Sequence, residues 1–178
     1  GATERGRGWT YAFYPDMKSA LAGSDALIDP AMEDTIAEYL AISEFRGSVH
    51  FSVLRPHPRS LPSATARAFA VKVDNVEAYI AALEQMESAA IERGLDAAFS
   101  AYLPIGSGPL FSGADGTLPY TADVMVHFDA ASSAELGALF DLYLNTETGA
   151  AFLEAVEPLQ RKIVSDQIVR CVNTNRAN

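Results

Sequence analysis

Apolar and polar positions alternate in several short stretches of the chain, and this pattern predicts strands. In residues 66–73, ARAFAVKV, every second side chain from Phe69 to Val73 is large and apolar, and the others are alanine or lysine. The same two-residue period recurs in residues 48–55, SVHFSVLR, and in residues 122–128, ADVMVHF. A period of two is typical of a strand with one buried face.

Helical patterns lie between these strands, and residues that commonly cap helices precede them. Asp74, with Glu77 three residues later, forms a capping-box pattern before an apolar stripe with three- and four-residue steps. Gly94 is placed to end that helix in a left-handed conformation. Ser132 and Glu135 repeat the capping box before the next helical stripe.

The order strand, helix, strand therefore occurs three times. Residues 9–55 form the first β-α-β unit, and residues 66–172 contain two more, which is the element order of a ferredoxin-like domain. The predicted fold class is α+β, with ferredoxin-like β-α-β repeats in an antiparallel sheet that packs its helices on one face. We expect both regions to form one compact body, with residues 1–8 disordered and residues 173–178 a loose tail. The sequence leaves open which two units pair and which one is the extra unit.

The late helical region and the closing strand resemble a known superfamily. The stretches TGAAFLEAVEPL, residues 148–159, and IVSDQIVRCV, residues 163–172, are similar in pattern to the dimeric α+β barrel superfamily, which includes cofactor-independent monooxygenases. The resemblance covers about the last 110 residues. It implies a homodimer and a sheet face that meets a partner or encloses a ligand, but it implies no catalytic residues, because this fold hosts many functions.

The alternation also assigns side chains to the two faces of the sheet. The large apolar side chains are expected beneath the helices, namely Val49, Phe51, Val53, Phe69, Val71, Val73, Val124, Val126 and Phe128. The side chains between them are expected on the other face, namely His50, Ser52, Lys72, Ser100, Tyr102, Asp123, Met125 and His127. The second set mixes polar and apolar groups, as ligand pockets do.

Most of this second set is predicted to bind a small apolar molecule, and the predicted ligand-binding residues are Lys72, Ser100, Tyr102, Asp123, Met125 and His127. His50 and His127 are the candidates for catalysis, because an imidazole exchanges protons near neutral pH. The two histidines lie on separate strands without the short spacing of metal ligands, so no metal site is predicted. The alternative for both is a half-buried, hydrogen-bonded position in an interface.

The composition of the chain limits the classes of partner and cofactor that it is expected to bind. The net charge of −10 and the lack of a basic run argue against nucleic acid, whose phosphates need clustered Lys and Arg. No apolar stretch approaches the roughly 20 residues of a membrane span. One cysteine, Cys171, excludes an internal disulfide framework and a cysteine-based zinc cluster, and no cofactor motif is present. The chain begins with Gly1, so removal of an export signal and a cytoplasmic location both remain open.

Three functions follow as hypotheses. The first is a small-molecule-binding protein, with the glycine-rich residues 105–117 as a mobile connector or lid over the ligand. The second is an enzyme of the cofactor-independent monooxygenase type, with His50 or His127 as the proton-transfer group. The third is a non-catalytic interaction protein whose second sheet face is packed solid. Convergence of the two histidines in a pocket would separate the second hypothesis from the first.

Overall fold

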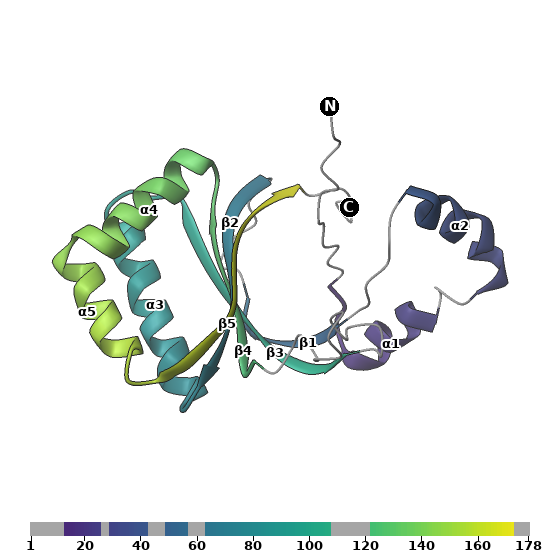
Figure 1. Ribbon diagram of the computed structural model, residues 1–178, viewed down its shortest axis with the longest axis horizontal. Helices are drawn as coiled ribbons and strands as arrows, with labels where there is room; N and C mark the ends of the chain where they lie inside the picture. Colours follow the sequence, from purple (N-terminus) through teal and green to yellow (C-terminus); the bar gives the residue numbers. More distant parts are fainter. Residues whose placement is uncertain (1–12, 26–28, 43–48, 57–62, 108–121, 173–178) are drawn as a thin grey trace. The chain divides into compact units, whose positions relative to one another are not determined.

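The computed structural model describes residues 13–25, 29–42, 49–56, 63–107 and 122–172. The chain divides into two compact units, residues 1–46 and residues 47–178. The elements, in chain order, are α1 (Met17–Asp25), the 3-10 helix η2 (Pro30–Met32), α2 (Glu33–Ile42), β1 (Val49–Arg55), β2 (Ser63–Val73), α3 (Val76–Glu92), β3 (Ala97–Ser107), β4 (Val124–Ala130), α4 (Ser133–Asn145), α5 (Glu147–Val156) and β5 (Gln160–Val172) (Figure 1).

The first unit contains α1, η2 and α2. Asp29 caps η2 by accepting a hydrogen bond from the Ala31 amide at 2.9 Å, and Pro30 takes the first helical position, which suits a residue without an N–H. The β-α-β unit predicted for residues 9–55 would begin with a strand at residues 9–14, but Phe13 and Tyr14 are not in a strand, and residues 9–12 lie outside the described residues. The predictions for residues 1–8, 173–178 and most of 105–117 also lie outside them.

The second unit is an α+β structure built on one antiparallel sheet. Its five strands lie in the order β1-β3-β4-β2-β5, and every neighbouring pair is antiparallel. The sheet curves, and α3, α4 and α5 cover one side of it (Figure 1). β1 pairs with β3 at one edge of this sheet, whereas the sequence pattern places residues 49–55 in a first β-α-β unit. The repeat of three β-α-β units remains a prediction.

The core lies between the sheet and these three helices. The helices contribute Tyr79, Leu83, Met86, Leu136, Leu139, Leu142, Phe152 and Val156. Among the strand residues, Phe128 stacks on Phe99 with ring centres 4.1 Å apart and meets Phe69 edge-on at 5.1 Å. The predicted helix-facing positions of β2 and β4 are all in this core, so their face assignment is confirmed.

The helix ends follow the predicted signals, with one shift. Asn75, and not Asp74, is the N-cap of α3, and its side chain accepts a hydrogen bond from the Ala78 amide at 3.0 Å. Asn is an equally good cap, and here the extended backbone is at position 75. Ser132 caps α4 as predicted, and Gly94 follows α3 with a positive φ of 77°.

A proline near the end of a strand predicts that the strand stops there, and for β3 this prediction is wrong, because the strand continues past Pro104 to Ser107. Pro104 is opposite Phe51 of β1, and the register shifts immediately beyond that pair. β4 pairs with β3 only as far as Tyr102, so Pro104 has no neighbour from β4. A proline is tolerated beside such an irregularity because no ladder hydrogen bond requires its missing N–H.

The predicted face of β1 is also wrong. Val53 is opposite Tyr102, and Phe51 meets the Tyr102 ring edge-on at 6.1 Å. Directly opposed residues of an antiparallel pair share a face, and Tyr102 in turn is opposite Met125, which is on the side away from the helices. Register shifts flank the segment from Phe51 to Val53, and a displacement by one residue reverses every side chain.

No helix in the described parts of the chain is both long and apolar enough to cross a membrane.

Candidate functional site

The candidate site is a row of side chains on the face of the sheet that points away from α3, α4 and α5, here called the far face. We define the far-face row as Ser100, Tyr102, Met125, His127 and Asp129. His127 of β4 is opposite Ser100 of β3, and Met125 is opposite Tyr102. All five residues are buried, with 0% to 7% of their surface exposed.

Alanines flank the row on the neighbouring strands. Ala68 of β2 is opposite His127, and Ala66 of β2 and Ala98 of β3 are opposite Asp129. These alanines are buried as well, with at most 2% exposed. Small neighbours bring the backbone of the sheet close to the imidazole and the carboxyl group, so His127 and Asp129 are larger than the side chains directly opposite them.

Aromatic rings extend the row towards β1. The rings of Tyr102 and His127 meet edge-on, with centres 5.4 Å apart and planes at 65°. Phe51 approaches Tyr102 from the other side. Edge-on contacts of this kind stabilise a fixed ring orientation beyond simple area burial. They therefore hold the imidazole in place next to an apolar wall.

Asp129 has the most unusual chemistry of the row. Its carboxyl group lies in a buried position, and this burial raises its pKa from 3.8 to about 7. Removal of water disfavours the charged form of a carboxyl group, so the group titrates near neutral pH. Since Asp129 is two residues from His127 on the same strand, two proton-exchanging groups lie on one face.

The structure brings four of the six predicted ligand residues together, namely Ser100, Tyr102, Met125 and His127. Lys72 is on the far face by alternation but lies near the end of β2, opposite Lys162 of β5. Asp123 does not join the row. Its carboxylate accepts hydrogen bonds from the Val73 amide at 2.9 Å and from Arg161 at 3.0 Å, so it fixes the start of β4.

The second catalytic candidate, His50, is in β1 opposite Gly106, but its side chain lies outside the described residues. The convergence of His50 and His127 therefore remains a prediction. Ser52 is opposite Leu103, which neighbours Tyr102 on β3 and so points to the opposite face. Ser52 is thus on the helix side and is not part of the row.

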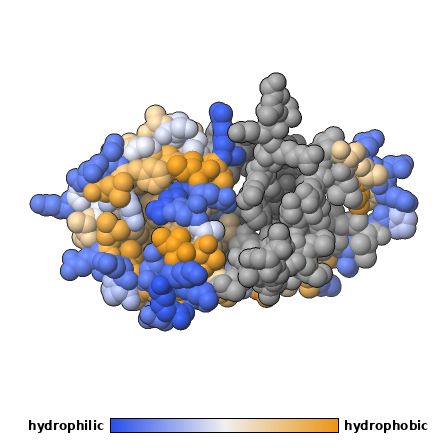
Figure 2. Space-filling view, in the orientation of Figure 1, coloured by the Kyte–Doolittle hydropathy of each residue, from blue (hydrophilic) through white to orange (hydrophobic). Residues whose placement is uncertain are grey.

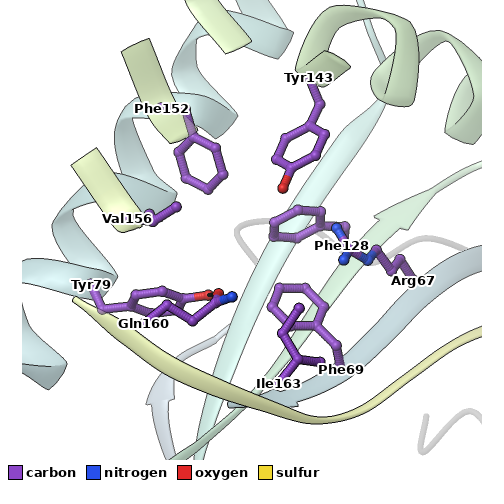
Figure 3. A pocket seen from close by; sticks show the side chains of 9 residues that line it. All are labelled: Arg67, Phe69, Tyr79, Phe128, Tyr143, Phe152, Val156, Gln160 and Ile163. Atoms are coloured by element: carbon purple, nitrogen blue, oxygen red, sulfur yellow. Dashed lines mark hydrogen bonds between the residues drawn. The ribbon is translucent and has the colours of Figure 1, made fainter. Parts of the chain in front are cut away.

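A small cavity lies on the helix side, between the sheet and the ends of α4 and α5 (Figure 3). Its volume is about 20 Å³, which is room for one water molecule and not for an organic ligand. Arg67 at its wall binds Asp166 through two hydrogen bonds of 2.8 and 2.9 Å and lies over the Phe69 ring. These contacts occupy the guanidinium group, so the cavity is a packing feature of the core.

A buried ion pair on the helix side anchors β1. Glu87 of α3 is 4% exposed, and its carboxylate accepts hydrogen bonds from the Phe99 amide at 2.6 Å and from the Arg55 guanidinium. Arg55 also donates to the Phe99 carbonyl and lies near Glu84. The cluster joins α3, β1 and β3, and this satisfies a carboxylate that would otherwise be costly to bury.

Sequence reasoning missed Asp129. The predicted strand ended at Phe128, although the same two-residue alternation, extended by one position, places Asp129 beside His127. It also missed the Arg55–Glu87 pair, whose partners are 32 residues apart and carry no local signal.

Within the described residues, no group of three or more His, Cys, Asp or Glu side chains is arranged to hold a metal ion. Searches of protein-family models, curated proteins and solved structures found no match to this chain.

Proposed function

We propose that the far face binds a small molecule that is largely apolar and carries one hydrogen-bonding group. The observation that supports this is the buried row itself, in which Tyr102 and Met125 offer apolar contact and Ser100, His127 and Asp129 offer polar groups at one end. Ligand sites combine an apolar lining with a few placed polar groups. A face that served packing alone would gain more stability from apolar side chains at these positions.

We further propose that residues 63–172 form a ferredoxin-like domain to which β1 adds an edge strand. The element order from β2 to β5 supports this, because it is β-α-β-β-α-β when the adjacent helices α4 and α5 are taken as one connection. The strand order β3-β4-β2-β5 within the sheet is compatible with this assignment. The relation to the dimeric α+β barrel superfamily stands as a proposal on the same grounds.

The binding proposal is tested with 1-naphthol, a neutral apolar ring system with one hydroxyl group. We expect saturable binding, observed as chemical-shift changes of the His127 imidazole by NMR, where the chain has only three histidines to resolve. Ser100→Ala removes a polar group of the row while keeping the His127 reporter, and it should weaken binding about fivefold, the equivalent of one hydrogen bond.

The matched control is Gln167→Ala. Gln167 is opposite Ala68 and so shares the far face, but it is exposed on the edge strand β5, and its loss should leave binding unchanged. The interaction-protein hypothesis predicts no saturable shift at all. That result would contradict the binding proposal.

The second candidate is an enzyme of the cofactor-independent monooxygenase type. The raised pKa of Asp129, about 7, favours it, because a group that titrates near the working pH is suited to accept a proton from a bound hydroxyl. The measurement is oxygen uptake in the presence of 1-naphthol. Uptake that is lost in Asp129→Asn supports the enzyme, whereas binding without uptake leaves the first candidate.

A further inference from the structure

The strand β5 leaves one side of the sheet unpaired. Among the described strands it is an end strand, with β2 as its neighbour, and it is 13 residues long. Most of its side chains are exposed, including Ile168 at 65%. A long exposed edge is a template for pairing with another strand, and proteins usually protect it with charges, prolines or bulges.

Both halves of β5 carry charged side chains, but only the first half is also irregular in its pairing. Arg161 and Lys162 are there, and the pairing with β2 is irregular around Val164, because Ala70 is opposite Ser165 while Val71 is opposite Ile163. From Ser165 onward the register with β2 is regular. The second half of the strand is therefore straight enough to receive a partner strand.

Next to this half lies an apolar groove with a volume of about 460 Å³. Ile168 of β5 and Phe140, Tyr143 and Leu144 of α4 form its apolar wall. Leu144 is 64% exposed, so both Leu144 and Ile168 present large apolar side chains to solvent at this groove. Apolar surface is visible between polar residues over the helices and β5 in Figure 2. A contiguous apolar surface beside an unpaired edge marks a contact site.

The charges on this half of β5 fit a second copy of the same strand. In an antiparallel pair with a two-fold axis at Ile168, Asp166 of each copy is opposite Arg170 of the other, and the two Ile168 side chains meet. The three residues share the helix-side face, since they are opposite Phe69, Arg67 and Thr65 of β2. Opposite charges at directly opposed positions stabilise a strand pair.

The contact between Asp166 and Arg67 is compatible with this arrangement. The Asp166 carboxylate accepts both Arg67 hydrogen bonds and is still 40% exposed, and a carboxylate has about four acceptor positions. A two-fold axis at Val164 would place Lys162 opposite Asp166. That register is unfavourable, because the irregularity at Val164 turns these two side chains to opposite faces.

We propose that the chain forms a two-fold symmetric dimer in which β5 pairs antiparallel with β5 of a second copy, centred on Ile168. The two sheets join into one, and the exposed Leu144 of each copy packs against the central isoleucine pair. This contact is self-complementary, as a two-fold interface requires. It is separate from the far face and does not depend on the proposed function.

The first test measures molar mass by light scattering after size exclusion, over a series of micromolar concentrations. We expect a dimer for the full chain, and an increase of at least about tenfold in its dissociation constant for Ile168→Lys, because two apolar contacts are lost and two like charges meet. Ile91→Lys is the matched control. Ile91 is an isoleucine of α3 that is 47% exposed, and its replacement should leave the dimer intact.

The second test locates the axis. In a Cys171→Ser background, Ile168→Cys places two thiols opposite each other, at the Cα separation of about 5 Å that a disulfide requires. Mild oxidation should then yield a covalent dimer, whereas Ile163→Cys in the same background should not. A monomer at every concentration, or a dimer that is unaffected by Ile168→Lys and does not cross-link through position 168, would overturn the proposal.

Discussion

Asp129 offers the sharpest test of the far-face row, through the pH dependence of stability. Its folded-state pKa of about 7 lies above its ordinary value of 3.8. Between these values the folded protein keeps a proton that the unfolded chain has released. The free energy of unfolding therefore falls as the pH rises through this window, and above about pH 7 the contribution is lost.

The size of the effect follows from the shift. Three pH units at about 1.36 kcal/mol per unit give a total of about 4 kcal/mol. Between about pH 5 and about pH 8.5, titration of this one group should lower the free energy of unfolding by about 3 kcal/mol. Asp129→Asn removes the titration, so the variant should lack this part of the pH dependence.

The assay is urea denaturation followed by circular dichroism at both pH values. The decisive quantity is the change with pH in the wild-type protein minus that in Asp129→Asn, because other titrating groups cancel in this difference. Glu154→Gln, at an exposed carboxylate of α5, is the control and should match the wild-type profile. If Asp129→Asn and the wild-type protein have parallel profiles, the carboxyl group is hydrated and the row is not buried as described.

Two further predictions concern the helices around the sheet. A side chain at Gly149 would collide with backbone carbonyl groups at the end of α4, so Gly149→Ala should lower the free energy of unfolding by about 2 kcal/mol. At Gly137 no atom lies within 4 Å of an added Cβ, so Gly137→Ala should raise the free energy of unfolding by about 0.5 to 1 kcal/mol. Arg55→Met leaves the buried Glu87 without its cation, so urea denaturation should show a free energy of unfolding that is lower by about 3 to 5 kcal/mol. Arg93→Met, at an exposed site, is the control and should lower it by less than about 1 kcal/mol.

The sequence was sufficient to predict the buried face of a strand where large apolar residues alternate with clearly smaller or polar ones. In β2 and β4 the large apolar residues alternate with smaller or polar ones, and only one face can meet the helices, so the core positions of Phe69 to Val73 and Val124 to Phe128 were predicted correctly. In β1 the alternation is as regular as in β2 and β4, but alternation alone shows only which residues share a face. The register shifts beside β3 decide which face meets the helices, and they depend on a partner strand about 50 residues away.

The two-residue alternation also predicted the part of the candidate site that lies on β3 and β4. Alternation placed Met125 and His127 on one face, and the antiparallel partner β3 brought Ser100 and Tyr102 to them. The burial that perturbs Asp129 arises only when the chain is folded, because it depends on the neighbouring strands β2 and β3 and not on adjacent positions in the sequence. The pair of Arg67 and Asp166 likewise joins residues 99 positions apart.

The two proposed surfaces lie on the same sheet but are separated by intervening strands. The far-face row is on β3 and β4, and β2 lies between β4 and the proposed seam at β5. In the dimer, five strand spacings separate the two copies of β4, which is about 24 Å. At this distance neither copy contributes a side chain to the row of the other. Binding at His127 and pairing at Ile168 are therefore independent properties of the chain, and the failure of either one would leave the argument for the other unchanged.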